Sequence, residues 1–168
     1  MSDLIRIGLV SDTHSYLDPK VFSYFDKCDE IWHAGDFGDE EVSHQLAAFK
    51  PLRGVWGNID EKNLRMIHPK DNIFEVGGMK IWMTHIGGYP PRYEPAIIRQ
   101  MPEIKPDIFI CGHSHILRVM PDKKNNLLYM NPGAAGKHGF HQMRTLLRFE
   151  IAGGRPQNLE VIELGKRA

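Results

Sequence analysis

Seven side chains able to bind metal ions stand directly after short apolar runs of this sequence. They occur in an Asp-x-His, a Gly-Asp, a Gly-Asn, a lone histidine and a Gly-His-x-His segment. Carboxylate, amide and imidazole ligands without a thiolate suit transition metals better than calcium, and they leave the identity of the metal open. Manganese is our first expectation, with iron, zinc, nickel or cobalt as alternatives. The seven side chains are Asp12, His14, Asp36, Asn58, His85, His113 and His115.

Their spacing predicts that they meet in one cluster. Residues two apart in an extended chain project to the same side, which applies to Asp12 with His14 and to His113 with His115. A glycine precedes three of the seven, where the missing Cβ permits a sharp turn and leaves room for ions. One ion needs only about four to six ligands, so the set predicts two divalent metal ions that share an aspartate. Asp36 is our candidate for that bridge.

The apolar runs themselves are expected to be strands. Two predicted helices, 19–27 and 39–50, separate the first three runs, and this alternation indicates parallel strands. Ligands gather at the carboxyl ends of parallel strands, which is where the candidate metal ligands stand. The five runs are 4–10, 30–34, 52–56, 79–84 and 107–111.

The second half of the chain alternates differently and predicts hairpins. The expected strand pairs are 72–76 with 80–84, 118–121 with 127–131, and 145–151 with 158–164. The sum is an α/β fold with two packed mixed β-sheets flanked by helices. At 168 residues without a dividing linker, the chain is expected to form a single domain, 1–168.

Composition narrows the class of function. Lysine plus arginine (21) equals aspartate plus glutamate (21), which argues against a dedicated nucleic-acid binder. No run is long enough to span a membrane, and Met1-Ser2-Asp3-Leu4 carries no secretory pattern, so we expect a cytoplasmic protein. Cys28 and Cys111 form no close pair and are expected to be buried. Whether the protein is a monomer or a small homo-oligomer stays open.

In this order, the five ligand segments resemble the calcineurin-like metallophosphoesterases, whose pattern is Asp-x-His, Gly-Asp, Gly-Asn-His-Asp/Glu, His and Gly-His-x-His. The resemblance is greatest to the small bacterial and archaeal phosphodiesterases, and it implies a four-layer αββα sandwich. It also implies one metal held by Asp12, His14, Asp36 and His115. The second metal would be held by Asp36, Asn58, His85 and His113.

This resemblance implies a phosphodiesterase that uses a metal-bridging hydroxide as nucleophile on a small-molecule phosphate ester. Asp36, Asn58 and His85 are our catalytic candidates. Where the wider family has a histidine after Gly-Asn, this chain has Ile59, which cannot donate a proton. We therefore expect rates that depend steeply on the acidity of the leaving group.

Several further residues are candidates for supporting roles. His138, His141 and Arg144 follow a Pro-Gly turn and are candidates for the proton donor or for substrate contact. Arg92, in the segment 87–93, is expected to line the substrate cleft and pair with phosphate, while a tyrosine of that segment stacks on the substrate.

The remaining histidines and tryptophans are given structural interpretations. His33 is expected to be packed or to support a ligand, whereas His44 and His68 are expected to be solvated. The three tryptophans, on predicted strands, are expected to be core residues: Trp32, Trp56 and Trp82.

A different class of function fits the same fold. The retromer coat contains a subunit of this fold that works as a scaffold with an incomplete metal site, so a non-catalytic scaffold is an alternative. A phosphomonoesterase, a nucleotide phosphohydrolase and a nuclease are alternatives among enzymes.

Overall fold

The computed structural model describes residues 3–168. Met1 and Ser2, which belong to the segment considered above for a secretory pattern, lie outside the described residues. None of the described helices is long and apolar enough to cross a membrane. In chain order the elements are β1 (Ile5–Val10), α1 (Lys20–Tyr24), β2 (Glu30–His33), α2 (Glu40–Phe49), β3 (Leu52–Gly54), α3 (Lys62–Ile67), β4 (Asp71–Val76), β5 (Met79–Thr84), β6 (Gly88–Tyr89), β7 (Arg92–Tyr93), α4 (Pro95–Ile104), β8 (Ile108–Ile110), β9 (Arg118–Asp122), β10 (Leu127–Asn131), β11 (Met143–Ala152) and β12 (Arg155–Lys166).

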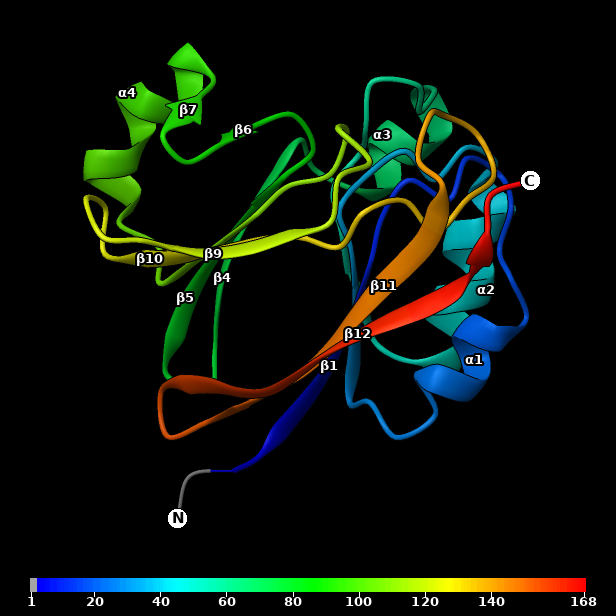
Figure 1. Ribbon diagram of the computed structural model, residues 1–168, viewed down its shortest axis with the longest axis horizontal. Helices are drawn as coiled ribbons and strands as arrows, with labels where there is room; N and C mark the ends of the chain where they lie inside the picture. Colours follow the sequence, from blue (N-terminus) through cyan, green and yellow to red (C-terminus); the bar gives the residue numbers. More distant parts are fainter. Residues whose placement is uncertain (1–2) are drawn as a thin grey trace.

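Two mixed five-stranded sheets form the centre of the molecule. One has the order β12-β11-β1-β2-β3 and the other β4-β5-β8-β10-β9. Figure 1 shows α1 and α2 beyond the first sheet and α4 beyond the second, so helices flank the two sheets on the outside. The predicted sandwich of two sheets with helices outside is confirmed.

The main hydrophobic core lies between the two sheets. Ile7 and Trp32 of the first sheet share one cluster with Ile81, Ile110 and Met130 of the second, and all five are fully buried. A second cluster packs α1 and α2 onto the first sheet, and a third packs α4 onto the second. This burial fixes the distance between the sheets, and with it the distance between the loops that carry the candidate ligands.

The strand predictions agree with the structure more closely than the helix predictions. Strands β1, β2 and β3 are parallel, as are β5 and β8, and the three predicted hairpins form as β4-β5, β9-β10 and β11-β12. Helix α1 covers only part of the predicted range 19–27. Helices α3 and α4 and the small β6-β7 pair were not predicted.

Candidate metal centre

The loops after β1 and β2 are joined by backbone hydrogen bonds. The N–H groups of Asp12 and His14 donate to the carbonyls of Gly35 and Asp36, each at 3.0 Å. Five of the seven candidate ligands have left-handed backbone conformations, with φ between 45° and 71°. Such φ values cost free energy in residues other than glycine, and they concentrate at functional sites. The five are Asp12, His14, Asp36, His113 and His115.

These φ values correct one step of the sequence argument. The pairs Asp12 with His14 and His113 with His115 were expected to share a side because the chain there is extended, but all four residues are left-handed. The two members of the second pair also face different groups of ligands. The side chains therefore converge through tight, strained loops rather than through strand geometry.

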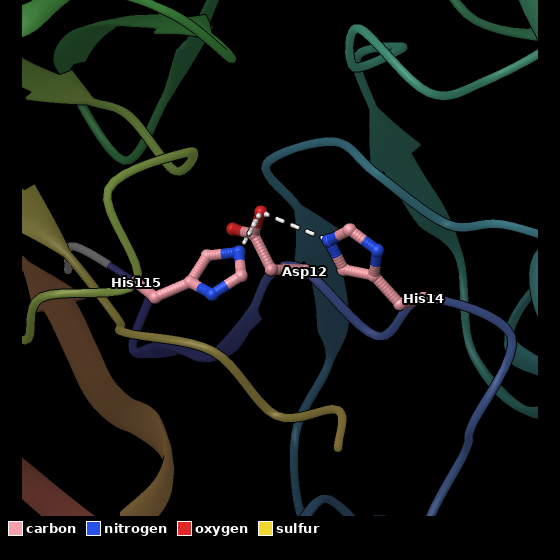
Figure 2. Close-up of side chains that lie close together, drawn as sticks. All are labelled: Asp12, His14 and His115. Carbon is pink, nitrogen blue, oxygen red and sulfur yellow. Dashed lines mark ion pairs between the residues drawn. The ribbon is translucent and has the colours of Figure 1, made fainter. Parts of the chain in front are cut away.

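The first group of ligand atoms belongs to Asp12, His14 and His115, whose atoms all lie within 4.8 Å of one another. His115 Nε2 lies 3.1 Å from Asp12 Oδ1, and His14 Nε2 lies 3.8 Å from the same oxygen. Figure 2 shows the two imidazole rings pointing at the Asp12 carboxylate from opposite sides. The aspartate and His14 come from the loop after β1, and His115 comes from the loop after β8.

The second group consists of Asp36, His85 and His113, again within 4.8 Å. Asp36 Oδ2 lies 3.2 Å from Nε2 of His85 and 3.3 Å from Nε2 of His14, so it faces one histidine of each group. Asn58, which follows β3 at the surface, places Oδ1 3.1 Å from Nδ1 of His113. The structure thus brings together all seven side chains singled out in the sequence.

Unpartnered polar atoms inside this cluster test whether it suits metal ions. Oδ1 of Asp12 and Nε2 of both His14 and His85 are buried without a hydrogen-bond partner. Burying such atoms unpaired costs about 1 to 3 kcal/mol each. Ligand atoms bound to one ion at about 2.1 Å stand roughly 3 to 3.5 Å apart, close to the spacing seen here. The donor set and its orphaned atoms fit a pair of divalent ions.

The charges of these groups are strongly coupled. Burial alone would raise the pKa of Asp12, but its contacts with His115 and His14 outweigh burial and hold the pKa far below its usual range. The pKa of Asp36 is lowered in the same way by His14 and His85. For His14, burial acts to lower the pKa, yet Asp12 and Asp36 raise it to about 9. Two ionised carboxylates therefore supply the negative charge that cations need.

Hydrogen bonds orient individual ligands. Nδ1 of His85 lies 2.7 Å from the carbonyl of Ala34, and because a carbonyl only accepts, this nitrogen carries the proton. In the neutral ring Nε2 then carries the lone pair, and this nitrogen faces Asp36. Asp12 Oδ2 accepts hydrogen bonds from Ser11 Oγ at 2.6 Å and from the His113 N–H at 3.1 Å, which leaves Oδ1 for a ligand.

Asp60 supports the site and was missed by the sequence analysis. Its buried carboxylate accepts backbone N–H groups from Phe37, Gly38 and Gly57 at 3.2, 2.9 and 2.8 Å. These bonds tie the loop after β2, which carries Asp36, to the loop after β3. Its place two residues after Asn58, in a family pattern that ends in an acidic residue, was the signal available in the sequence.

The glycines before the ligands permit close approach, as expected, and Gly35 has a φ of 102°. A Cβ added to Gly35 would lie 2.5 Å from Nδ1 of His85, and one on Gly57 would overlap Oδ1 of Asp36. The space that these glycines clear is filled by ligand side chains of the neighbouring loops.

Three other histidine interpretations are resolved by burial. His33 is fully buried and accepts the Gly35 N–H, as the packed interpretation predicted. His44 is exposed, as expected. His68 is not solvated: it is buried, stacks on Phe37 with a centroid distance of 4.6 Å and lies 2.8 Å from Ser43 Oγ. Burial lowers its pKa to about 4.

The supporting residues proposed from the sequence separate in the structure. Arg144 is buried and pairs with Asp18 at 2.8 Å, so it cannot contact substrate and that expectation is wrong. Arg92 is exposed, but neither it nor any other residue of the segment 87–93 lines the hollow bordered by the candidate ligands. The two tyrosines of this segment have partners within the protein. The Tyr89 ring lies under the guanidinium of Arg118, and the Tyr93 hydroxyl donates a hydrogen bond to Asp122.

His138 and His141 do lie beside the cluster. His138 stacks on His14 with a centroid distance of 4.8 Å, and the ring of His141 meets His115 edge-on at 5.1 Å. His141 Nε2 lies 2.8 Å from the Gly136 carbonyl. Of the three tryptophans expected in the core, Trp32 and Trp82 are fully buried. Trp56 is only half-buried, beneath Arg65, so the expectation is wrong for this residue.

Above the ligands the surface is hollowed into a cleft of about 540 Å³. Five of the candidate ligands line it: His14, Asp36, Asn58, His113 and His115. His138 and His141 line it as well. The opening leaves room for a small molecule to reach the candidate ligands.

Solved structures with the same fold come from several sources. Vps29 from Entamoeba histolytica, described as complexed with Zn²⁺, has a TM-score of 0.73 at 17% identity, covering 98% of this chain and 100% of that one. A novel archaeal phosphodiesterase gives 0.73 at 19% identity, covering 94% and 100%. A predicted phosphoesterase from Streptococcus pneumoniae gives 0.67 at 21% identity, covering 97% and 99%.

Comparisons of sequence reach the level of the family. No curated protein matches the chain. The family model described as the calcineurin-like phosphoesterase superfamily domain matches residues 5–154, which include every strand of the two sheets except β12 and all seven candidate ligands. The chain therefore belongs to the calcineurin-like phosphoesterase superfamily.

Proposed function

We propose that the protein is a binuclear-metal-dependent phosphoesterase, and most specifically a phosphodiesterase. The observation that carries the proposal is Oδ2 of Asp36, 3.3 and 3.2 Å from the inward-facing nitrogens of His14 and His85. An oxygen so placed between two three-residue groups suits a bridge between two ions.

Asp12, His14, Asp36 and His115 would hold one ion, and Asp36, Asn58, His85 and His113 the other. Two divalent ions at such a site supply Lewis acidity, which acidifies water for attack at phosphorus and neutralises the phosphate oxygens. Manganese is our first expectation, and the Zn²⁺ named for the Entamoeba Vps29 structure supports zinc as an alternative.

The chain's own residues hold the reacting groups in place. The Ala34 carbonyl fixes the tautomer of His85, so that its Nε2 is free to bind. The Ile59 N–H donates to Oδ1 of Asp36 at 3.1 Å, which sets the orientation of the carboxylate. The backbone of residue 59 thereby has a role that does not depend on its side chain.

The side chain of Ile59 favours diesters with acidic leaving groups as the substrates. Ile59 lines the cleft where a family histidine would offer a proton to the departing oxygen. A leaving group that departs as a stable anion needs no such donor. Aryl diesters are therefore favoured over alkyl esters, and the name of the archaeal phosphodiesterase of the same fold points to the same class.

The test is a substrate screen on protein of known metal content. We expect bis-aryl phosphate to be cleaved with manganese, and kcat/KM to fall steeply from aryl to alkyl leaving groups. Ile59→His should raise cleavage of alkyl diesters about tenfold or more, because it restores a donor. Monoesters as much better substrates than any diester would contradict the phosphodiesterase assignment. A flat leaving-group dependence would instead show that another residue donates the proton.

The likeness to Vps29 favours a second candidate, a non-catalytic scaffold that binds metal without hydrolysis. Retention of all seven ligands argues against it. Metal-loaded protein without chelator-sensitive hydrolysis of any phosphate ester would establish the scaffold instead.

We also propose that the chain forms a single domain, since one hydrophobic cluster unites both sheets. We further propose a cytoplasmic location, which rests on the sequence alone.

A further inference from the structure

Three large hydrophobic side chains stand exposed around the cleft over the metal ligands. Ile59 is 42% exposed, Ile116 is 54% exposed and Phe140 is fully exposed, and all three line this cleft. Single exposed hydrophobic residues are ordinary, but a group that borders a polar floor marks a binding surface.

The lining of this cleft contains no lysine or arginine among residues 3–168. Lys62 and Arg65 border the adjoining hollow beyond Ile59, but the Arg65 guanidinium lies over Trp56 and donates to the Asp60 carbonyl at 2.7 Å. Recognition of several phosphates requires clustered arginine or lysine, so the cleft is poorly suited to polyphosphates and nucleic acid.

The position of Phe140 follows from its local backbone. Gly139, with φ of 130°, packs so closely on His115 that a Cβ there would collide with the imidazole. Downstream, His141 is bonded to the Gly136 carbonyl, which closes the short loop. Phe140 is therefore held beside the metal ligands although its ring contacts solvent, and that ring is free to stack.

We propose that the cleft selects esters with a single phosphate and an apolar, preferably aromatic, organic group, which rests against Phe140, Ile116 and Ile59. This inference rests on the proposed function and names its substrate class. The candidate metal ligands in the floor account for the phosphate, and the wall accounts for the rest of the molecule. Burial of each additional methylene should tighten binding by about fourfold.

The test compares two monoanionic probes that contain no ester bond, methyl(phenyl)phosphinate and dimethylphosphinate, on manganese-loaded protein by calorimetry. We expect the phenyl compound to bind about tenfold tighter. Phe140→Ser and Ile116→Ser should each reduce this preference to about threefold or less. The matched control is Ile98→Ser on α4, where a 56% exposed isoleucine lies outside the cleft. It should keep the full preference.

Equal affinity for the two probes, binding of neither, or a preference that both variants retain would overturn the inference. Hydrolysis of methyl p-nitrophenyl phosphate by the same preparations separates this outcome from failure of the proposed function. Hydrolysis without phenyl preference removes only the substrate class. Phenyl preference that depends on Phe140, without hydrolysis, leaves the cleft assignment standing and removes the catalytic one.

Discussion

Two neighbouring groups of histidines differ in the partners of their ring nitrogens and in the direction in which their pKa values are shifted. In the metal cluster, His14 and His85 face carboxylates, and the pKa of each is raised above its ordinary value, although burial opposes the rise. In the stack His33–Phe37–His68, two histidines enclose a phenyl ring at centroid distances of 3.6 and 4.6 Å. There burial lowers the pKa values to about 3 and about 4.

The difference teaches that the partners of a buried histidine decide its use. Cluster nitrogens are left unpartnered beside ionised oxygens, an arrangement that stabilises cations. In the stack, both ring nitrogens of His33 have partners: Nδ1 accepts the Gly35 N–H, and Nε2 lies 3.1 Å from Thr13 Oγ1. Nε2 of His68 pairs with Ser43 Oγ. The stack is expected to stabilise the fold, and the cluster is expected to bind metal ions and to take part in catalysis.

Metal removal should give the largest effect, and only in the cluster. Chelation should lower phosphodiesterase activity by about 10³-fold or more, because the proposed chemistry depends on the ions. Readdition of manganese should restore it, and far-UV circular dichroism should stay unchanged. Full activity in metal-free protein, verified by mass spectrometry, would remove the functional contrast between the two groups.

Exchange of one histidine in each group sharpens the contrast. His85→Gln should lower both metal content and kcat/KM, the latter by about 10²-fold, because its Nε2 faces Asp36. His68→Gln should leave kcat/KM within about twofold while lowering the free energy of unfolding by about 2 kcal/mol. Metal analysis, kinetics and urea denaturation measure these effects. Reversed outcomes would mean that the groups have been assigned the wrong way round.

The stack also predicts how stability depends on pH. The pKa of His68 is about 4 in the folded protein and 6.5 ordinarily, so the unfolded chain binds a proton between these values that the folded chain resists. Stability from neutral His68 is therefore complete above pH 6.5 and is lost as pH falls towards 4, by up to about 3 kcal/mol. His68→Gln should reduce this dependence, measured by denaturation from pH 7 to 4. The exposed control His44→Gln should not.

The smallest effect concerns Gly54, the last residue of β3, which packs directly against the stack. A Cβ at Gly54 would lie 2.9 Å from Nδ1 of His68, so Gly54→Ala should displace the stack and cost about 1 to 2 kcal/mol. Metal content should be unaffected. Loss of metal in this variant would show that the stack and the cluster are coupled.

The sequence predicted the cluster because its members follow strands that local patterns reveal. Apolar runs that are followed within two residues by Asp12, Asp36 or His113 can be recognised in the sequence without tertiary information. The left-handed conformations of these residues were not, since no pattern distinguishes a strained loop from an extended one. Their convergence was therefore predicted for a reason that is partly wrong.

The stack could not be predicted in the same way. His68 directly follows α3, a helix of six residues whose weak local pattern gave no signal, and its burial requires Ser43 of α2 and Phe37. Arg144 was misjudged similarly, because its partner Asp18 is distant in sequence. Partners contributed by remote elements are set by tertiary packing, which single-sequence patterns do not encode.

The most direct test of the binuclear centre is the metal-to-protein ratio in wild type and in Asp36→Asn, measured by mass spectrometry after loading with manganese and removal of free ions. Asp39→Asn, an exposed aspartate on the next turn of chain, serves as the control. We expect two ions per chain in wild type and control, and at most one weakly held ion in Asp36→Asn. A single ion in the wild type, or two ions retained without the Asp36 carboxylate, would contradict the shared bridge.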